Sequence, residues 1–120
     1  MRESKLWVFH LISGAVIFVL LSIHMFIMHL DTILNSIGFG LQPPISWNAV
    51  FARSKDLFFM ITYIILLGAA LYHGLYGFKN ILFELTLTKK LEKVISGVLT
   101  FCGILLFVYG TYAAIFVFTK

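Results

Sequence analysis

The sequence predicts an all-α membrane protein with three transmembrane helices, and two observations carry this prediction. Hydrophobic residues make up 61% of the 120 residues and charged residues only 12%, whereas soluble domains carry about 25% charged residues. Three long segments contain no Asp, Glu, Lys or Arg, namely Leu6–Leu30, Leu57–Phe78 and Val94–Thr119. A helix needs about 20 residues to cross a bilayer, and each of these segments is longer than that. Because backbone amides must be satisfied internally in lipid, helices are expected for all three segments.

The three helices are expected to form a single transmembrane domain over residues 1–120. Their expected bounds are about residues 7–30, 55–84 and 91–118. Arg2 and Lys5 precede the first helix, as in a signal peptide, but its apolar run is too long and lacks a clear small-residue cleavage site, so a retained helix is favoured. The short link between the second and third helices predicts that these two are antiparallel neighbours.

The link over residues 31–54 is longer and too apolar for a free tether. Pro43–Pro44 predicts a rigid, non-helical piece, and a short amphipathic helix is expected near residues 46–53. We expect this link to lie on the outer membrane surface with Trp47 at the interface, where an indole is stable.

Basic residues give the expected orientation. The amino-terminal segment and residues 79–93 hold six of the nine Lys and Arg residues. With three crossings these two regions share one face. The positive-inside rule then places the amino terminus and the 79–93 loop in the cytoplasm and the carboxyl terminus outside. Cys102, the only cysteine, is expected to be a small buried apolar residue within the third helix.

Four histidines lie within or beside the predicted spans. His29, close to Asp31, fits an ordinary interfacial residue, and so could His10, one turn inside the first helix. His24 and His73 lie deeper, where an ionisable side chain is expected to face a bundle interior and to be functional.

Neutral imidazole is a ligand for haem iron, whereas zinc needs three or four converging ligands, and neither an H-E-x-x-H motif nor a cysteine cluster occurs. At 1.5 Å per residue, His24 and His73 differ by roughly 16 Å in depth. Two axial nitrogens on one iron lie only about 4 Å apart, taking about 2 Å per bond as for imidazole on zinc. The two histidines are therefore expected to bind different haems, one or two in number, each completed by a histidine of another chain.

Small residues mark the positions where helices pack closely. Gly97, Gly103 and Gly110 on the third helix are typical of helix–helix contact. Gly74 and Gly77 stand beside His73, so they are also candidates for making room for a bound group.

The segments "HGLYGFKNILFEL" and "HLISGAVIFVLLSIHM" resemble the small three-helix cytochrome b anchor of the succinate dehydrogenase and fumarate reductase family. In that family a histidine is followed by a small residue, by a glycine three residues further on and by an acidic residue about eleven after the histidine. Here these are His73, Gly74, Gly77 and Glu84. The resemblance runs over nearly the whole chain.

The resemblance implies a haem b-binding electron-transfer subunit that anchors a flavoprotein subunit and an iron–sulfur subunit beside a second membrane-anchor subunit. Electrons would pass between iron–sulfur clusters and a membrane quinone, in respiratory complex II of the tricarboxylic acid cycle. His73 becomes an axial ligand of a proximal haem and His24 of a distal one. His10 and Ser13 are placed to hydrogen-bond a propionate or a quinone oxygen, and Gly74 and Gly77 to lie against the macrocycle.

One departure concerns the quinone. Many family members follow the acidic residue with a tyrosine that hydrogen-bonds the quinone, whereas here Leu85 follows Glu84. The quinone site then involves other subunits, lies elsewhere, or uses Tyr72 or Tyr76 in place of that tyrosine.

Two alternatives remain open on the residues alone. One is an anchor cytochrome b of a hydrogenase or formate dehydrogenase type. The other is a haem-free structural subunit, in which His24 and His73 hydrogen-bond neighbouring helices. No Rossmann fingerprint or nucleophile constellation is present, so no dicarboxylate chemistry is expected in this chain.

Overall fold

The computed structural model describes residues 2–40, 43 and 45–120, and in this part of the chain every regular element is a helix. The elements are α1 (Arg2–Ser36), α2 (Trp47–Ser54), α3 (Leu57–Phe83) and α4 (Lys89–Thr119). Three of them, α1, α3 and α4, are long and apolar enough to cross a membrane. The all-α class with three candidate spans is therefore confirmed.

The ends of α1 lie further out than the apolar run indicated. The helix begins at Arg2 and continues to Ser36, because after Leu30 the sequence offers neither proline nor glycine before Gly38. Gly38 then takes a φ of +98°, and Gly40 a φ of +60°. This left-handed conformation is open to glycine and ends a helix. The predicted loop 31–54 therefore starts as helix, and its residues 41, 42 and 44 lie outside the described residues.

Side-chain caps set the starts of the other helices. The carboxylate of Asp56 accepts a hydrogen bond from the Phe58 amide at 2.8 Å, so α3 begins at Leu57. The Thr88 hydroxyl accepts from the Leu91 amide at 3.3 Å and starts α4. Both are preferred N-cap residues because their oxygen satisfies an amide that the helix leaves unpaired.

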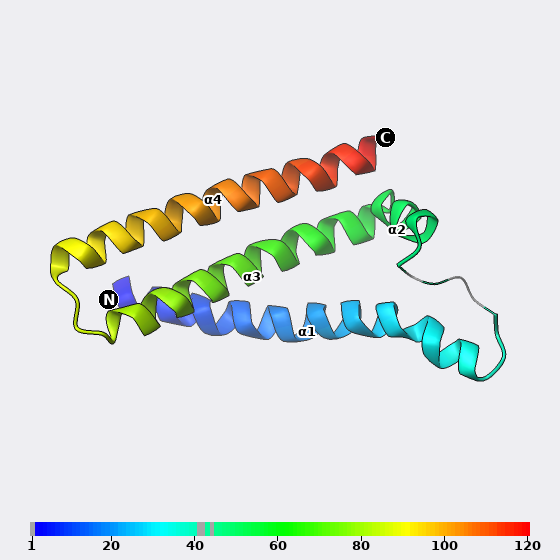
Figure 1. Cartoon of the computed structure of the whole chain (residues 1–120), viewed down its shortest axis with the longest axis horizontal. Helices are drawn as coiled ribbons and strands as arrows, with labels where there is room; N and C mark the ends of the chain where they lie inside the picture. The colour runs from blue at the N-terminus through cyan, green and yellow to red at the C-terminus, as the bar shows by residue number, and fades with distance from the viewer. Residues whose placement is uncertain (1, 41–42, 44) are drawn as a thin grey trace.

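The three long helices form a flat row with α3 in the middle (Figure 1). The molecule measures 59 × 32 × 22 Å. Over the described residues, α1 and α4 each pack on α3 and their backbones do not meet. The amino terminus lies beside the carboxyl end of α3, whereas α2 and the carboxyl terminus lie at the opposite end (Figure 1).

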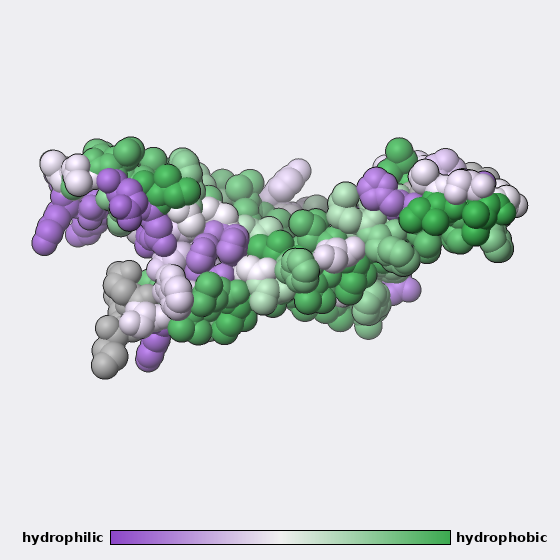
Figure 2. Space-filling model, turned by 90° about the horizontal axis from the view of Figure 1, so that it is seen from below, coloured by the Kyte–Doolittle hydropathy of each residue, from purple (hydrophilic) through white to green (hydrophobic). Residues whose placement is uncertain are grey.

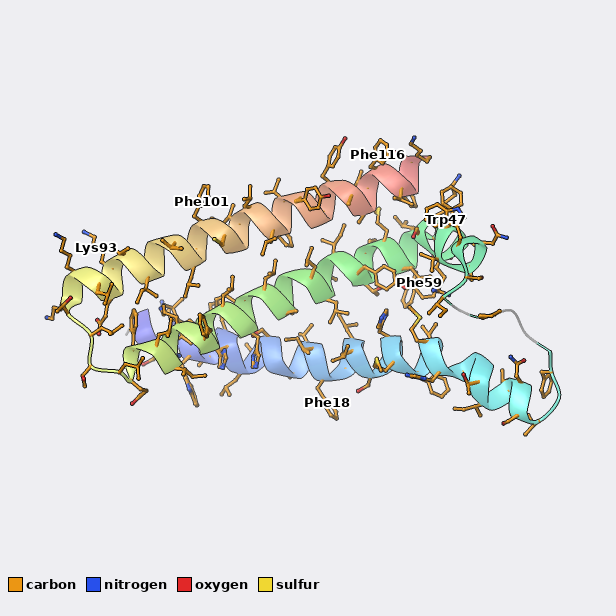
Figure 3. All side chains as sticks on the ribbon, in the orientation of Figure 1. Phe18, Trp47, Phe59, Lys93, Phe101 and Phe116 are labelled. Atoms are coloured by element: carbon orange, nitrogen blue, oxygen red, sulfur yellow. The ribbon has the colours of Figure 1, made fainter. Side chains whose placement is uncertain are left out.

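A single row of helices has almost no interior of its own. Among the described residues only Ser13 and Tyr76 are buried. Figure 2 shows apolar residues over most of one face, with hydrophilic residues mainly toward the ends. Phe18 on α1 and Phe101 on α4 point away from the neighbouring helices (Figure 3). Both broad faces of the row are thus suited to lipid or to further helices.

Glycines bring α4 close to α3. A Cβ at Gly103 would lie 2.7 Å from Cδ1 of Leu75, and one at Gly110 would clash with Leu67. In the other direction, Gly68 of α3 receives the ring of Phe107. Gly97, in contrast, has open space around it. Close helix–helix contact therefore accounts for two of the three α4 glycines that the sequence singled out.

The short helix α2 matches the amphipathic helix expected near residues 46–53. Its N-cap Ser46 accepts a hydrogen bond from the Ala49 amide at 3.3 Å. Trp47 is 77% exposed and stacks loosely on Phe51, with ring centroids 6.1 Å apart. Figure 3 shows Trp47 at the α2 end of the row. An exposed indole at a helix end is what an interfacial anchor requires.

Candidate functional site

Two of the four histidines meet where α1 crosses α3. The imidazole rings of His10 and His73 are stacked, with centroids 4.1 Å apart and planes 3° from parallel. Both side chains are half-buried. His10, which the sequence left open as a merely interfacial residue, is thus the direct neighbour of the strongest ligand candidate.

The contact of His73 with the α1 backbone fixes its tautomer. Nδ1 of His73 lies 3.1 Å from the carbonyl oxygen of His10. Because a carbonyl oxygen can only accept, Nδ1 must carry the hydrogen, and in the neutral imidazole Nε2 then has the free lone pair. Nε2 makes no hydrogen bond to a described residue and is not fully enclosed. This is the arrangement in which a histidine ligates a metal through Nε2 while its other nitrogen donates to a backbone carbonyl.

The same carbonyl accepts a second hydrogen bond from α1 itself. The hydroxyl of Ser13, a buried side chain, donates to the His10 carbonyl oxygen at 2.8 Å. Inside α1 this oxygen is also the acceptor for the Gly14 amide, so Ser13 and His73 donate to a carbonyl that the helix already engages. Ser13 thus supports the acceptor that orients His73.

Each imidazole rests on a glycine of the opposite helix. A Cβ at Gly14 would lie 3.0 Å from Cε1 of His73, and one at Gly77 would lie 3.3 Å from Cε1 of His10. The two helices carry the same pattern, "HLISG" from His10 and "HGLYG" from His73. Because α1 and α3 are antiparallel, the histidine of each pattern faces the glycine of the other. This repeated His-x3-Gly pattern is the sequence signal that could have predicted the pair.

The two site glycines of α3 differ in their surroundings. Gly77 is covered by His10, whereas Gly74 is exposed and has nothing within 4 Å of a Cβ built on it. The open surface beside His73 is therefore at Gly74.

Two tyrosines continue the cluster toward the carboxyl end of α3. The Tyr72 hydroxyl donates to the Leu6 carbonyl oxygen at 2.8 Å, which ties the two helices together a second time. Tyr76, only 9% exposed, stacks on Tyr72 and lies 5.2 Å from the His10 ring, centroid to centroid. The ammonium of Lys79 sits 4.8 Å over the Tyr76 ring. Such a cation–π contact leaves the positive charge in place.

His24 lies apart from this cluster. Its ring meets Tyr63 of α3 edge to face, with centroids 5.8 Å apart. A cavity of about 30 Å³ adjoins it between α1 and α3, which is room for about one water molecule. No hydrogen bond to a described residue orients its imidazole, in contrast to His73.

The structure does not bring His24 and His73 together. His73 contacts α1 at His10, and His24 is fourteen residues further along the same helix, about 21 Å along its axis. Over the described residues no group of three or more His, Cys, Asp or Glu side chains converges. Glu84, the C-cap of α3, and the following Leu85 are both exposed at the end of the row.

Fold and site together define a membrane-spanning helical subunit with a histidine pair at a helix crossing. The sequence model of the succinate dehydrogenase/fumarate reductase transmembrane subunit matches residues 2–108, and the chain belongs to this family. Neither the curated proteins nor the solved structures yield a significant match. The family match agrees with the resemblance carried by the His73 and His10 segments.

Proposed function

We propose that this chain is a haem b-binding membrane-anchor subunit of a succinate:quinone oxidoreductase. It would hold the iron–sulfur and flavoprotein subunits on the membrane and pass electrons between iron–sulfur clusters and a quinone. Family membership supports the anchor role. The observation that carries the haem is the state of His73, whose Nδ1 is held by the His10 carbonyl while Nε2 stays available.

The residues around His73 fit one side of a haem. A hydrogen bond from Nδ1–H to a carbonyl raises the basicity of the other nitrogen and sets the direction of its lone pair. Packing against Gly14 fixes the orientation of the His73 ring, and Gly74 leaves an open surface beside that ring. When bound, haem supplies one-electron transfer at a potential that the axial ligands tune. The second axial histidine would come from the other membrane-anchor subunit.

A second haem at His24 is part of the same proposal. His24 is half-buried between α1 and α3 toward the α2 end. Its imidazole is oriented by an edge contact with Tyr63 rather than by a hydrogen bond. Substitution of His24 should therefore affect a separate haem, in a site that depends more on the partner subunit.

The quinone is proposed to bind near Tyr76 and Glu84, at the end of the row where α3 is linked to α4. The Tyr72 hydroxyl is engaged by Leu6, whereas the Tyr76 hydroxyl has no hydrogen bond to a described residue. Tyr76 therefore has a donor to offer a quinone carbonyl. The positive-inside rule puts this end in the cytoplasm, where the iron–sulfur subunit would dock.

The test is the reduced-minus-oxidised spectrum and the haem-to-protein ratio of the purified complex, for wild type, His73→Ala and His24→Ala. We expect each substitution to remove one distinct b-type component. Loss in His73→Ala alone would leave a single haem and a structural role for His24. Absence of haem from the wild-type complex would contradict the proposal and leave a haem-free anchor.

A further inference from the structure

A groove of about 560 Å³ runs between α3 and α4. Along α4 it extends from Ser96 to Phe107, about 16 Å at 1.5 Å per residue. Its walls are mainly apolar side chains such as Leu71, Leu75 and Leu99. Since both helices are candidate spans, the groove runs parallel to them and hence along the path of a lipid acyl chain.

One cation lies at the end of this groove that is nearest the α3–α4 loop. Lys79 lines the groove and is half-buried. Its ammonium stands over the rings of Tyr76 and Phe83, and it forms no ion pair with any carboxylate that the structure describes. A half-buried charge in a low-dielectric surrounding is costly until an opposite charge meets it.

The depth of Lys79 corresponds to the level of lipid headgroups. Helix α3 has 27 residues and is about 40 Å long, so about 5 Å protrude on each side of a hydrocarbon core of about 30 Å. Lys79 lies four residues before the end of α3, about 6 Å from it. The ammonium is therefore placed where hydrocarbon gives way to phosphate.

The opposite wall and the loop add to the same chemistry. Ser96 of α4 lines the groove with a hydroxyl group that can donate to a phosphate oxygen, whereas Thr100 lies about 6 Å deeper, beside the acyl chain. Three further lysines stand at the start of α4, namely Lys89, Lys90 and Lys93. Figure 3 shows Lys93 at this end of the helix. Basic pockets between transmembrane helices on the cytoplasmic side are typical sites for anionic lipid headgroups.

We propose that the α3–α4 groove binds one anionic phospholipid, with its phosphate at Lys79 and one acyl chain lying between the two helices. Tyr76, proposed above as a quinone donor, also lines this groove, so a lipid and a quinone are competing occupants here. A quinone ring is neutral and would leave the Lys79 charge uncompensated. With the lipid bound, the quinone would contact this chain at Glu84. A helix of another subunit would do the same unless it brought a carboxylate to this level. The lipid site does not depend on haem at His73.

The experiment measures lipid retained by the intact complex. The complex is equilibrated with detergent micelles that contain equal amounts of phosphatidylglycerol and phosphatidylcholine, then passed through a sizing column, and bound lipid is quantified by mass spectrometry. The expected result is about one retained phosphatidylglycerol per chain in preference to phosphatidylcholine. Lys79→Gln should lower this preference about fivefold, because one lysine at a membrane surface contributes that much. Lys120→Gln, at the opposite end of α4 and outside the groove lining, should leave it unchanged.

Two substitutions by phenylalanine test whether the lipid occupies the groove itself rather than the charged surface around it. Thr100→Phe fills the groove and should remove the retained lipid, whereas Cys102→Phe on the same helix, at an exposed position outside the lining, should not. Elution of each variant from the sizing column as an intact complex reports on folding and should match wild type. Equal phosphatidylglycerol retention in wild type, Lys79→Gln and Thr100→Phe would overturn the proposal. So would displacement of the lipid by an added short-chain quinone that is retained one per chain, because the groove would then be a quinone pocket.

Discussion

The orientation of His73, the proposed haem ligand, is set by a backbone atom as much as by side chains. The His10 carbonyl accepts hydrogen bonds from Ser13 and from His73 Nδ1, and the His73 ring lies flat against Gly14. A substitution at His10 changes its side chain but leaves this backbone carbonyl in place. The orientation of His73 is therefore most sensitive to the space at Gly14, and its access to a bound group to the space at Gly74.

Substitution Gly14→Val should displace the His73 ring. The new Cβ would lie 3.0 Å from Cε1, closer than ordinary contact, and overpacking of this kind costs about 1–3 kcal/mol. We expect the haem-to-protein ratio of the complex to fall several-fold, as measured by the pyridine haemochrome. Gly97→Val, whose Cβ meets nothing within 4 Å in this chain, is the matched control. Full haem content in Gly14→Val would show that His73 does not need this packing.

Substitution Gly74→Val tests where the macrocycle lies. Within this chain the added side chain meets open space, so the α1–α3 packing should be unaffected. We expect haem content to fall because the macrocycle is proposed to occupy that space. The assembled complex should still elute intact from a sizing column. Unchanged haem content together with an intact complex would place the macrocycle away from Gly74.

At the scale of elements, the row depends on α3, because α1 and α4 each pack on it. The α3–α4 contact is built from glycines that receive leucines, with Gly110 facing Leu67 and Gly103 facing Leu75. Lipid tails are as apolar as leucine, so the hydrophobic effect does not drive two helices together inside a bilayer. Close packing of this kind is therefore a main reason why α3 and α4 associate.

Substitution Gly110→Val should lower the thermal stability of the complex. The valine would press on Leu67, and overpacking costs about 1–3 kcal/mol. The double variant Gly110→Val with Leu67→Ala should recover part of the loss, since the smaller residue on α3 makes room for the larger one on α4. Differential scanning fluorimetry of the purified complex measures both. A double variant less stable than the sum of the two single effects would contradict the pairing.

At the scale of the whole molecule, three crossings place the two ends of the chain on opposite sides. Single cysteines in a Cys102→Ala background report this in whole cells through a membrane-impermeant maleimide. We expect labelling from outside at Lys120→Cys and no labelling at Ser4→Cys or Thr86→Cys until the membrane is opened. The reverse pattern would invert the orientation that the lysine distribution predicts.

Local patterns explain why the helices could be predicted and the site could not be predicted in full. The three apolar runs are properties of single segments, so the spans follow from the sequence. The helix ends depend on particular residues, such as the caps Asp56 and Thr88 and the breaker Gly38. The stacking of His10 on His73 depends on the register in which α1 crosses α3, and neither helix specifies that register alone.

The central claim is that His73 supplies an axial nitrogen to haem, and the redox potential of His73→Met tests it most directly. Replacing one histidine ligand by methionine raises the potential of a haem iron. We predict that the b-type component assigned to His73 titrates at a clearly higher potential in His73→Met, or is lost, while the component assigned to His24 keeps its potential. An unchanged spectrum and an unchanged potential for every component would contradict the account, because the iron would then be held by other residues.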